Sequence, residues 1–105
     1  MEKNYPSSAK VVVIGGGVAG TSCAYHLAKF GWKDVVLLER DQLTSGTTWH
    51  AAGLIGQLGA TSTITKIRKY SLDLYKELEK TTGLSTGLKQ NGAITVASSQ
   101  ERMQE

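Results

Sequence analysis

The sequence predicts an α/β fold that opens with a strand, a helix and a second strand. A run of β-branched residues occupies Val11–Ile14, small and apolar residues recur at helical spacing over about Val18–Phe30, and a second apolar run occupies Val35–Leu38. Gly31 stands where such a helix ends. Because both short runs are apolar without alternation, we expect two parallel strands that are buried on both faces and joined by a right-handed crossover.

Three glycines between the first strand and the helix satisfy the spacing G-x-G-x-x-G. Here Gly15 allows a tight turn, Gly17 lets a pyrophosphate approach the backbone, and Gly20 lets the helix pack closely on the strand. The first helical residues, Val18 and Ala19, then direct free N–H groups and the positive end of the helix dipole at the phosphates. The pattern predicts a dinucleotide site, with a glycine-rich turn of another α/β protein as the alternative.

An acidic residue closes the second strand, roughly twenty residues beyond the last glycine. This residue, Glu39, is placed to accept hydrogen bonds from a ribose diol, and its charge would repel a 2′-phosphate. NADP is therefore disfavoured, whereas NAD and FAD both remain open. In the alternative, Glu39 only caps a strand. Together these features predict the N-terminal part of a Rossmann-like domain.

The segment after Glu39 indicates which of the two cofactors, NAD or FAD, the chain would bind. An NAD domain would continue with another crossover helix, but RDQLTSGTTWHAAGLIGQLGATST shows little periodicity until about Ser62. So long a stretch of small residues predicts a path along a bound ligand. Hydroxyls and close backbone amides for a second phosphate region come from Ser45, Gly46, Thr47 and Thr48. Only a long cofactor such as FAD would still be present there.

The remaining chain predicts scaffold rather than a catalytic site. An amphipathic helix is expected from about Ser62 up to Gly83. Its apolar face would consist of Ile64, Ile67, Ser71, Leu74 and Leu78. Its basic side chains, which predict a solvated face more than a binding patch, are Lys66, Arg68, Lys69 and Lys76.

The C-terminal part predicts a turn, a strand and a further helix. Asn91-Gly92 is a turn signal, and Ala93–Ala97 reads as a strand. Ser98 and Glu101 have the spacing of a capping box, which predicts that a helix begins there.

Composition and charge exclude several classes of function. The net charge of +3 in 105 residues comes from Lys and Arg scattered among acids, so it does not predict a nucleic-acid partner. No apolar run approaches the roughly 18 residues of a membrane span, and the polar leader, residues 1–9, carries no signal-peptide pattern. We therefore expect a bacterial cytoplasmic protein, or one of the mitochondrial matrix if a presequence is missing.

With a single cysteine and two histidines, the sequence predicts no metal site. Cys23 has no partner for a disulfide and is expected to be a small packing residue rather than a reactive thiol. His26 is expected to be a packing or surface residue of the first helix. No carboxylate pattern accompanies the histidines, so we expect no zinc site.

The Glu39-Arg40 pair and the stretch LTSGTTWHAAGL resemble the sarcosine and dimethylglycine dehydrogenases of the D-amino-acid-oxidase-like flavoprotein superfamily. The later TGLSTGLKQNGAITVASSQERMQE also resembles sarcosine dehydrogenase. The similarity runs from about Lys10 to the end of the chain, and TTWHAAG is its most specific part.

The resemblance implies a covalent flavin. In this family the histidine of the block is joined to the 8α-methyl carbon of FAD, and the matching residue is His50, whose neutral imidazole is a competent nucleophile near pH 7. A loop-capping histidine is the alternative. Besides the glycine loop and Glu39, the cofactor-binding residues implied are Arg40, Ser45, Gly46, Thr47, Thr48, Trp49, His50, Ala51, Ala52, Gly53 and Leu54.

For a complete protein the resemblance implies oxidative demethylation of an N-methylated glycine. The resulting iminium would release formaldehyde or be captured by tetrahydrofolate, and electrons would pass to an electron-transfer flavoprotein. Two alternatives stay open: a related oxidoreductase with noncovalent FAD and another substrate, or a regulatory homologue of the pyruvate dehydrogenase phosphatase regulatory subunit type. The sequence leaves sarcosine against dimethylglycine, and dehydrogenase against oxidase, undecided.

The domain organisation is expected to be that of an N-terminal piece. Residues 1–9 would be a flexible leader and residues 10–105 a partial FAD-binding domain, whose last part, about 84–105, begins the substrate domain. Two strands are too few for a whole dinucleotide domain. Catalytic residues that contact the amine are expected outside this piece, which alone would be inactive.

Overall fold

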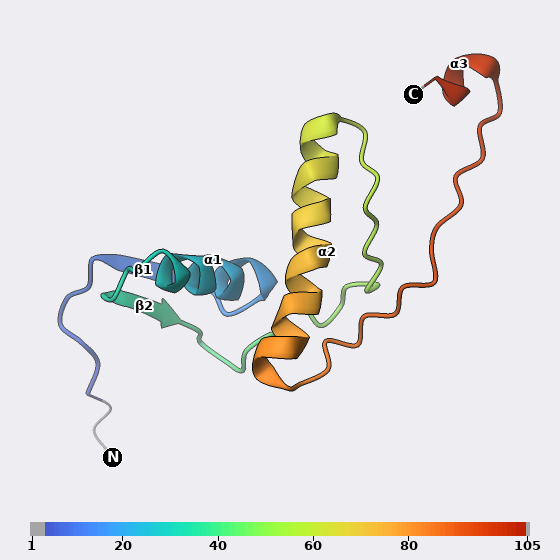
Figure 1. The fold of residues 1–105 in the computed structure, drawn as a ribbon. Coiled ribbons are helices and arrows are strands. Elements are labelled where there is room, and N and C mark those ends of the chain that lie inside the picture. Colours follow the sequence, from blue (N-terminus) through green and yellow to red (C-terminus); the bar gives the residue numbers. More distant parts are fainter. Residues whose placement is uncertain (1–3, 105) are drawn as a thin grey trace. The chain divides into compact units, whose positions relative to one another are not determined.

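The computed structural model describes residues 4–104 of the chain. Its elements, in order, are β1 (Val11–Ile14), α1 (Val18–Lys29), β2 (Val35–Leu38), α2 (Ser62–Thr82) and α3 (Gln100–Met103) (Figure 1). The chain divides into two compact units, Met1–Gly53 and Leu54–Glu105, which are described separately below. The first three residues of the expected leader and the last residue of the chain lie outside the described residues.

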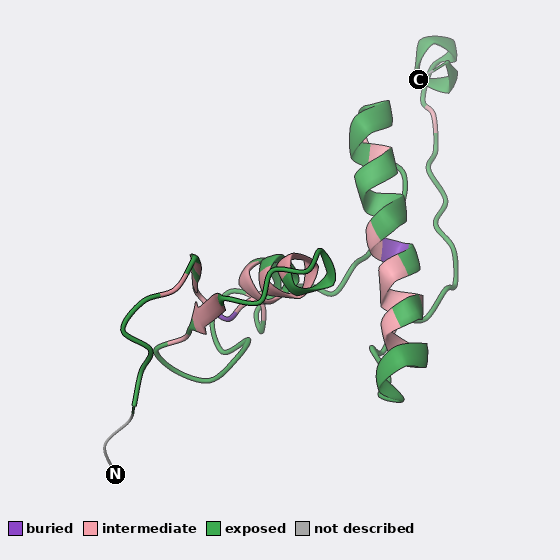
Figure 2. Ribbon diagram, turned by 60° about the vertical axis from the view of Figure 1, so that its left-hand side comes forward, coloured by how far each residue is buried: buried purple, intermediate pink, exposed green. Residues whose placement is uncertain are grey.

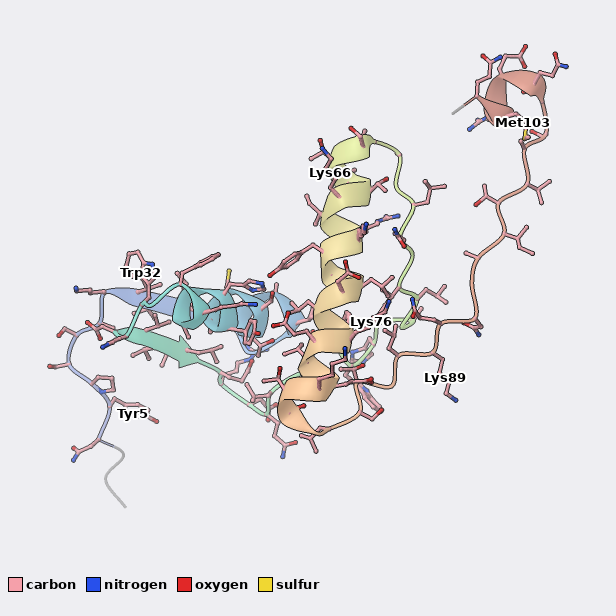
Figure 3. The ribbon with its side chains drawn as sticks, in the orientation of Figure 1. Tyr5, Trp32, Lys66, Lys76, Lys89 and Met103 are labelled. Carbon is pink, nitrogen blue, oxygen red and sulfur yellow. The ribbon has the colours of Figure 1, made fainter. Side chains whose placement is uncertain are left out.

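The first unit is the predicted βαβ arrangement. β1 and β2 pair in parallel, with Val11 opposite Val35 and Ile14 opposite Leu38, and α1 connects them and contacts both strands. The helix ends at Lys29, and the N–H of Trp32 then bonds to the carbonyl of Leu27 at 3.0 Å. Figure 3 shows Trp32 in this connection between α1 and β2. The mixed α/β fold predicted from the sequence is therefore confirmed.

The expectation that both faces of the strands are buried is wrong within residues 4–104. Val13 lies on the side of α1, 3.4 Å from the position that a Cβ on Gly20 would take. Successive strand residues alternate between faces, and Val12 and Ile14 on the other face are 49% and 85% exposed. α1 covers one face of this sheet, and Figure 2 shows little burial elsewhere in the unit.

The segment just before β1 lies beside the open face of the sheet. Tyr5, Pro6 and the following residues up to Ala9 line a hollow of about 470 Å³ together with Val12, Val36 and Leu38 of the strands. Tyr5 is labelled in Figure 3. This part of the expected leader therefore borders the exposed face of the sheet.

The second unit is built on α2. Thr61 caps its start, because the Thr61 hydroxyl accepts a hydrogen bond from the N–H of Ile64 at 3.3 Å. Gly83 ends it in the left-handed conformation, with φ of 68°, and donates its N–H to the carbonyl of Glu79. Both predicted ends are confirmed.

The predicted apolar face of α2 is only partly correct. Ile64 and Ile67 are 41% and 61% exposed, whereas Leu72, which the predicted stripe omitted, is buried at 9% exposure. Leu74 and Leu78 are half-buried as expected. The most buried position thus lies one residue beyond Ser71, so the covered side of the helix is rotated from the predicted one.

The chain that leads into α2 is fastened to the helix by polar contacts. The N–H of Gly59 donates to the Thr65 hydroxyl at 3.0 Å, and the Arg68 guanidinium donates to the carbonyl of Leu58 at 2.6 Å. Lys66 and Lys69 are exposed as expected for a solvated face, and Figure 3 shows Lys66 and Lys76 on α2. Arg68 differs from them because it holds the preceding segment.

Two predictions after α2 are corrected. Ala93–Ala97 is irregular rather than a strand, with Ile94 94% exposed, because no neighbouring strand in the described residues pairs with it. The cap of α3 is Ser99 rather than Ser98, since the Ser99 hydroxyl accepts the N–H of Arg102 at 3.3 Å. Figure 3 places Lys89 on the segment between α2 and α3, and Met103 on α3.

Candidate dinucleotide site

The glycine loop has the two backbone features predicted for its first and last glycines. Gly15 adopts φ of 108° and donates its N–H to the carbonyl of Leu38 at 2.8 Å, so the turn is fixed against the end of β2. A Cβ on Gly20 would lie 1.8 Å from the Gly15 carbonyl oxygen, closer than atoms can approach. The loop and α1 therefore meet at a distance that only glycine allows.

The middle glycine of the run, Gly16, has a structural role that the motif does not reveal. It is buried, its N–H donates to Glu39 Oε2 at 2.7 Å, and its carbonyl accepts the N–H of Thr44 at 3.0 Å. A Cβ on Gly16 would lie 2.6 Å from Leu43 Cδ2. Gly16 occupies a variable position of G-x-G-x-x-G, so the pattern carried no signal for these contacts.

Glu39 connects β2 to the glycine loop. Besides the N–H of Gly16, its carboxylate accepts the N–H of Asp41 at 3.0 Å. These two hydrogen bonds, Gly16 first, hold the pKa of the Glu39 carboxyl below its ordinary value of 4.5. An ionised carboxylate can accept about four hydrogen bonds, so Glu39 keeps acceptor capacity for a ribose diol.

The depressed pKa of Glu39 predicts an acid-sensitive contribution to stability. The folded state favours the ionised carboxylate, so the contribution is fully present above pH 4.5 and is lost as the pH falls through the lower pKa of the folded state. We expect the free energy of unfolding of the cofactor-free protein to exceed that of Glu39→Gln at neutral pH, and the difference to shrink below pH 4.5.

Urea unfolding at a series of pH values measures this difference. Glu77→Gln is the matched control because it removes a carboxylate from α2, in the second unit. A difference in the free energy of unfolding between wild type and Glu39→Gln that stays constant from neutral pH to pH 3 would contradict this prediction. It would mean that the stability of the folded state does not depend on ionisation of Glu39.

The Thr48 hydroxyl binds the first backbone N–H of α1, so the expectation of a free N–H at Val18 is wrong. The N–H of Val18 is not free but donates to Thr48 Oγ1 at 2.9 Å. A Cβ on Gly17 would lie 2.9 Å from the same oxygen, so the space beside Gly17 is taken by Thr48. The Thr48 hydroxyl still carries a hydrogen that it can donate outward.

A cleft of about 760 Å³ brings most of the predicted site residues together. It lies entirely within the first unit, between the carboxyl ends of the strands, the start of α1 and the turns after β2. The predicted residues that line it are Gly15, Gly17, Val18, Ala19, Gly20, Glu39, Arg40, Ser45, Gly46, Thr47, Thr48 and Ala51. Ile14, Leu38 and Asp41 complete the lining, and the sequence did not single them out.

The histidine of the block lies on the adjoining turns, outside this lining. His50 is exposed, its N–H donates to the Thr47 carbonyl at 3.1 Å, and its Nδ1 lies 2.9 Å from the Gly46 carbonyl oxygen. Trp49 is 76% exposed. Ala52 and Gly53 follow as exposed residues, and Leu54 belongs to the second unit.

The other candidate residues lie elsewhere. Cys23 is exposed on α1, so the expectation of a packing residue is wrong within the described residues, because β1 and β2 are the only described elements that pack on this helix. His26 is half-buried on the same helix, with Nδ1 2.7 Å from the Ser22 carbonyl oxygen. Residues 4–104 contain no group of three or more His, Cys, Asp or Glu side chains arranged to hold a metal ion.

None of the helices in these residues combines the length and apolar character needed to cross a membrane.

Comparison with known proteins places this geometry in context. Residues 10–105 match the family described as FAD dependent oxidoreductase (DAO). Human mitochondrial sarcosine dehydrogenase is 50% identical over 101 residues, which cover 95% of this chain and 11% of that protein. Human mitochondrial dimethylglycine dehydrogenase is 47% identical over 104 residues, covering 99% of this chain and 12% of that protein.

A regulatory protein is similar to the same degree. The mouse mitochondrial pyruvate dehydrogenase phosphatase regulatory subunit is 45% identical over 98 residues, which cover 93% of this chain and 11% of that protein. The chain thus spans 11% to 12% of the length of these curated relatives.

Proposed function

The chain belongs to the family of FAD-dependent oxidoreductases, and on this premise we propose that the full natural polypeptide oxidatively demethylates an N-methylated glycine, sarcosine or dimethylglycine. The observation that carries the proposal is the bond from Val18 to Thr48, 30 positions apart, by which the predicted glycine loop and the predicted TTWHAAG block form one site. The names of the two human dehydrogenases supply the substrate class.

The residues of the cleft fit an FAD dinucleotide. The N-terminus of α1, a helix of 12 residues, offers its dipole and the N–H of Ala19 to the phosphates. The Thr48 hydroxyl can add a donor at the same place, and Glu39 can accept from the adenosine ribose. Bound FAD supplies the acceptor for the hydride, while these residues bind and orient it.

We further propose that His50 tethers the flavin. A carbonyl oxygen only accepts hydrogen bonds, so the contact with Gly46 requires that Nδ1 carries the proton of the neutral ring. Nε2 then keeps its lone pair, and it is the nitrogen available to form a bond with an electrophilic 8α-methylene. Trp49, Ala52, Gly53 and Leu54 would line the isoalloxazine around it.

The proposed reaction converts the N-methyl group into a one-carbon product. The substrate would lose a hydride from this group to bound FAD and become an iminium, and addition of water to the iminium would release formaldehyde and the demethylated amine. Capture of the one-carbon unit by tetrahydrofolate, and electron transfer to an electron-transfer flavoprotein, are further proposals for parts of the protein outside this chain.

The domain organisation also remains a proposal. Residues 10–105 would form part of the FAD-binding domain, with about 84–105 at the beginning of the substrate domain and residues 1–9 as a leader. For the compartment we propose the bacterial cytoplasm or the mitochondrial matrix; the two human relatives are mitochondrial proteins.

Two alternatives are separated from this proposal by experiment. The similarity to the mouse phosphatase regulatory subunit favours a regulator as the second candidate. A related oxidoreductase with noncovalent FAD and another substrate is the third. The regulator would not oxidise any amine, and the related oxidoreductase would oxidise another substrate.

The test is amine-dependent reduction of the full natural polypeptide. We expect sarcosine or dimethylglycine, added without oxygen, to bleach the flavin absorption, and then to reduce a redox dye with one formaldehyde released for each two electrons. Glycine, which lacks the N-methyl group, is the matched control. Bound flavin that neither methylated amine reduces would exclude the demethylase and leave the two alternatives.

A further inference from the structure

Thr44 adopts a backbone conformation that its side chain disfavours. Its φ of 67° makes it the one non-glycine residue with positive φ in the part of the chain that the structure describes. In this region Cβ crowds the following carbonyl, and a β-branched residue such as threonine is a genuine outlier there. The surrounding contacts must therefore determine the conformation.

Those contacts hold Thr44 to the glycine loop. Its N–H donates to the Gly16 carbonyl at 3.0 Å, and its own carbonyl accepts the N–H of Trp49 at 3.1 Å. The preceding side chain, Leu43, fills the space that a Cβ on Gly16 would occupy, 2.6 Å away. Thr44 is thus fixed at both of its peptide groups and through its neighbour.

The position of the following turns depends on this residue. After Thr44 the chain reverses, and Thr48 Oγ1 reaches the N–H of Val18 at 2.9 Å, at the first residue of α1. Thr47 lies on the same stretch and lines the cleft with Thr48. If Thr44 adopted the ordinary negative φ, the chain would leave Gly16 in another direction, and the Thr48 hydroxyl would not meet the start of α1.

We propose that Thr44 is a positioning residue for the dinucleotide: its left-handed conformation, fastened to Gly16, holds the Thr48 hydroxyl at the N-terminus of α1 and keeps Thr47 in the lining of the cleft, where the phosphates would bind. This inference rests on the proposed binding of FAD at the cleft. It assigns no contact with FAD to Thr44 itself.

The test measures FAD affinity with Thr44→Pro and Thr44→Gly in the full natural polypeptide. Both are made in a His50→Ala background, so that FAD binds reversibly and its dissociation constant follows from quenching of flavin fluorescence. Proline fixes φ near −65° and removes the N–H that bonds to Gly16, whereas glycine keeps the N–H and permits the observed φ.

We expect Thr44→Pro to weaken FAD binding by roughly ten- to a hundredfold, the effect of losing one hydrogen bond to a charged group. Thr44→Gly should stay within about threefold of the background protein, since it keeps every bond that fixes the turn. At saturating FAD the KM for the amine should not change, which separates positioning of the dinucleotide from general damage to the protein.

A second variant decides the outcome if Thr44→Pro does not fold. Leu43→Ala removes an exposed side chain that packs against Gly16 next to Thr44. We expect this variant to bind FAD more weakly. In the cofactor-free protein, we also expect faster deuterium exchange in a peptide covering residues 15–20. FAD affinity and exchange equal to the background in a folded Thr44→Pro or in Leu43→Ala would overturn the inference. Absence of bound FAD from wild type as well as from the background protein would instead refute the proposed function.

Discussion

Gly20→Ala is expected to abolish dinucleotide binding and to destabilise the first unit by about 3 kcal/mol, at the upper end of the usual cost of overpacking. The added Cβ would lie 1.8 Å from the Gly15 carbonyl oxygen and 3.0 Å from its carbonyl carbon. These are backbone atoms, and the Gly15 peptide is fixed to Leu38 by its N–H, so no flexible side chain can move aside. α1 must shift away from the loop.

The expected loss of stability in Gly20→Ala is opposite in sign to the change that helix propensity predicts. Alanine in the interior of an exposed helix is favoured over glycine by about 1 kcal/mol, so propensity alone predicts stabilisation. Gly46→Ala is the matched control in the same unit, since a Cβ there meets no atom within 4 Å. Urea unfolding of the cofactor-free proteins gives the free energies, and bound flavin is measured after reconstitution with FAD. A stability for Gly20→Ala equal to that of Gly46→Ala would refute the close approach of loop and helix.

His50→Ala is expected to eliminate covalent flavin while leaving the protein able to bind FAD. The His50 side chain is exposed, and its Nδ1 contacts the carbonyl oxygen of Gly46. Because His50 does not line the cleft, its replacement by alanine leaves the cleft lining intact. The full natural polypeptide is denatured and separated by electrophoresis, and flavin fluorescence is read on its band. We expect a fluorescent band from wild type, background fluorescence from His50→Ala, and native FAD content within about twofold of wild type, because the lost tether is outside the phosphate and ribose contacts.

His26→Ala is the control for this experiment, since it removes the other histidine, on α1. It should retain the fluorescent band. A band that stays fluorescent in His50→Ala would move the tether to another residue. A yellow native protein whose wild-type band is dark would establish noncovalent FAD and favour the related oxidoreductase with another substrate.

The sequence predicted the βαβ unit because its signals are local. The two β-branched runs and Gly15 specify strands and turn within a few residues, and the end of α2 at Gly83 follows from a cap with the same property. Burial was harder to predict, since Ile14 and Leu72 depend on which other layers cover them. Composition identifies an apolar residue but not its neighbours.

The site shows the same division between local and distant determinants. The glycines and Glu39 in the cleft lining were predicted because their spacing belongs to a recurring pattern, and the residues from Ser45 to Ala51 were predicted from the small-residue segment and the family resemblance. Ile14, Leu38 and Asp41 were not predicted to line the cleft. Gly16 and Thr44 were missed because their roles arise from contacts across the fold. A strand was wrongly predicted at Ala93–Ala97, since alternation of β-forming residues gives no strand without a partner to pair with.

The two-sided attachment of Gly16 has a consequence for the order of folding. Its N–H bonds to Glu39, 23 positions away, and its carbonyl to Thr44, so the shape of the glycine loop is not encoded by the loop alone. The entropy of closing these chain segments must be offset before the loop becomes rigid. A nascent chain that has released only the loop and α1 therefore contains the motif without its binding geometry. We therefore expect affinity for the dinucleotide to arise only after β2 has paired with β1 and the chain behind β2 has returned to Gly16.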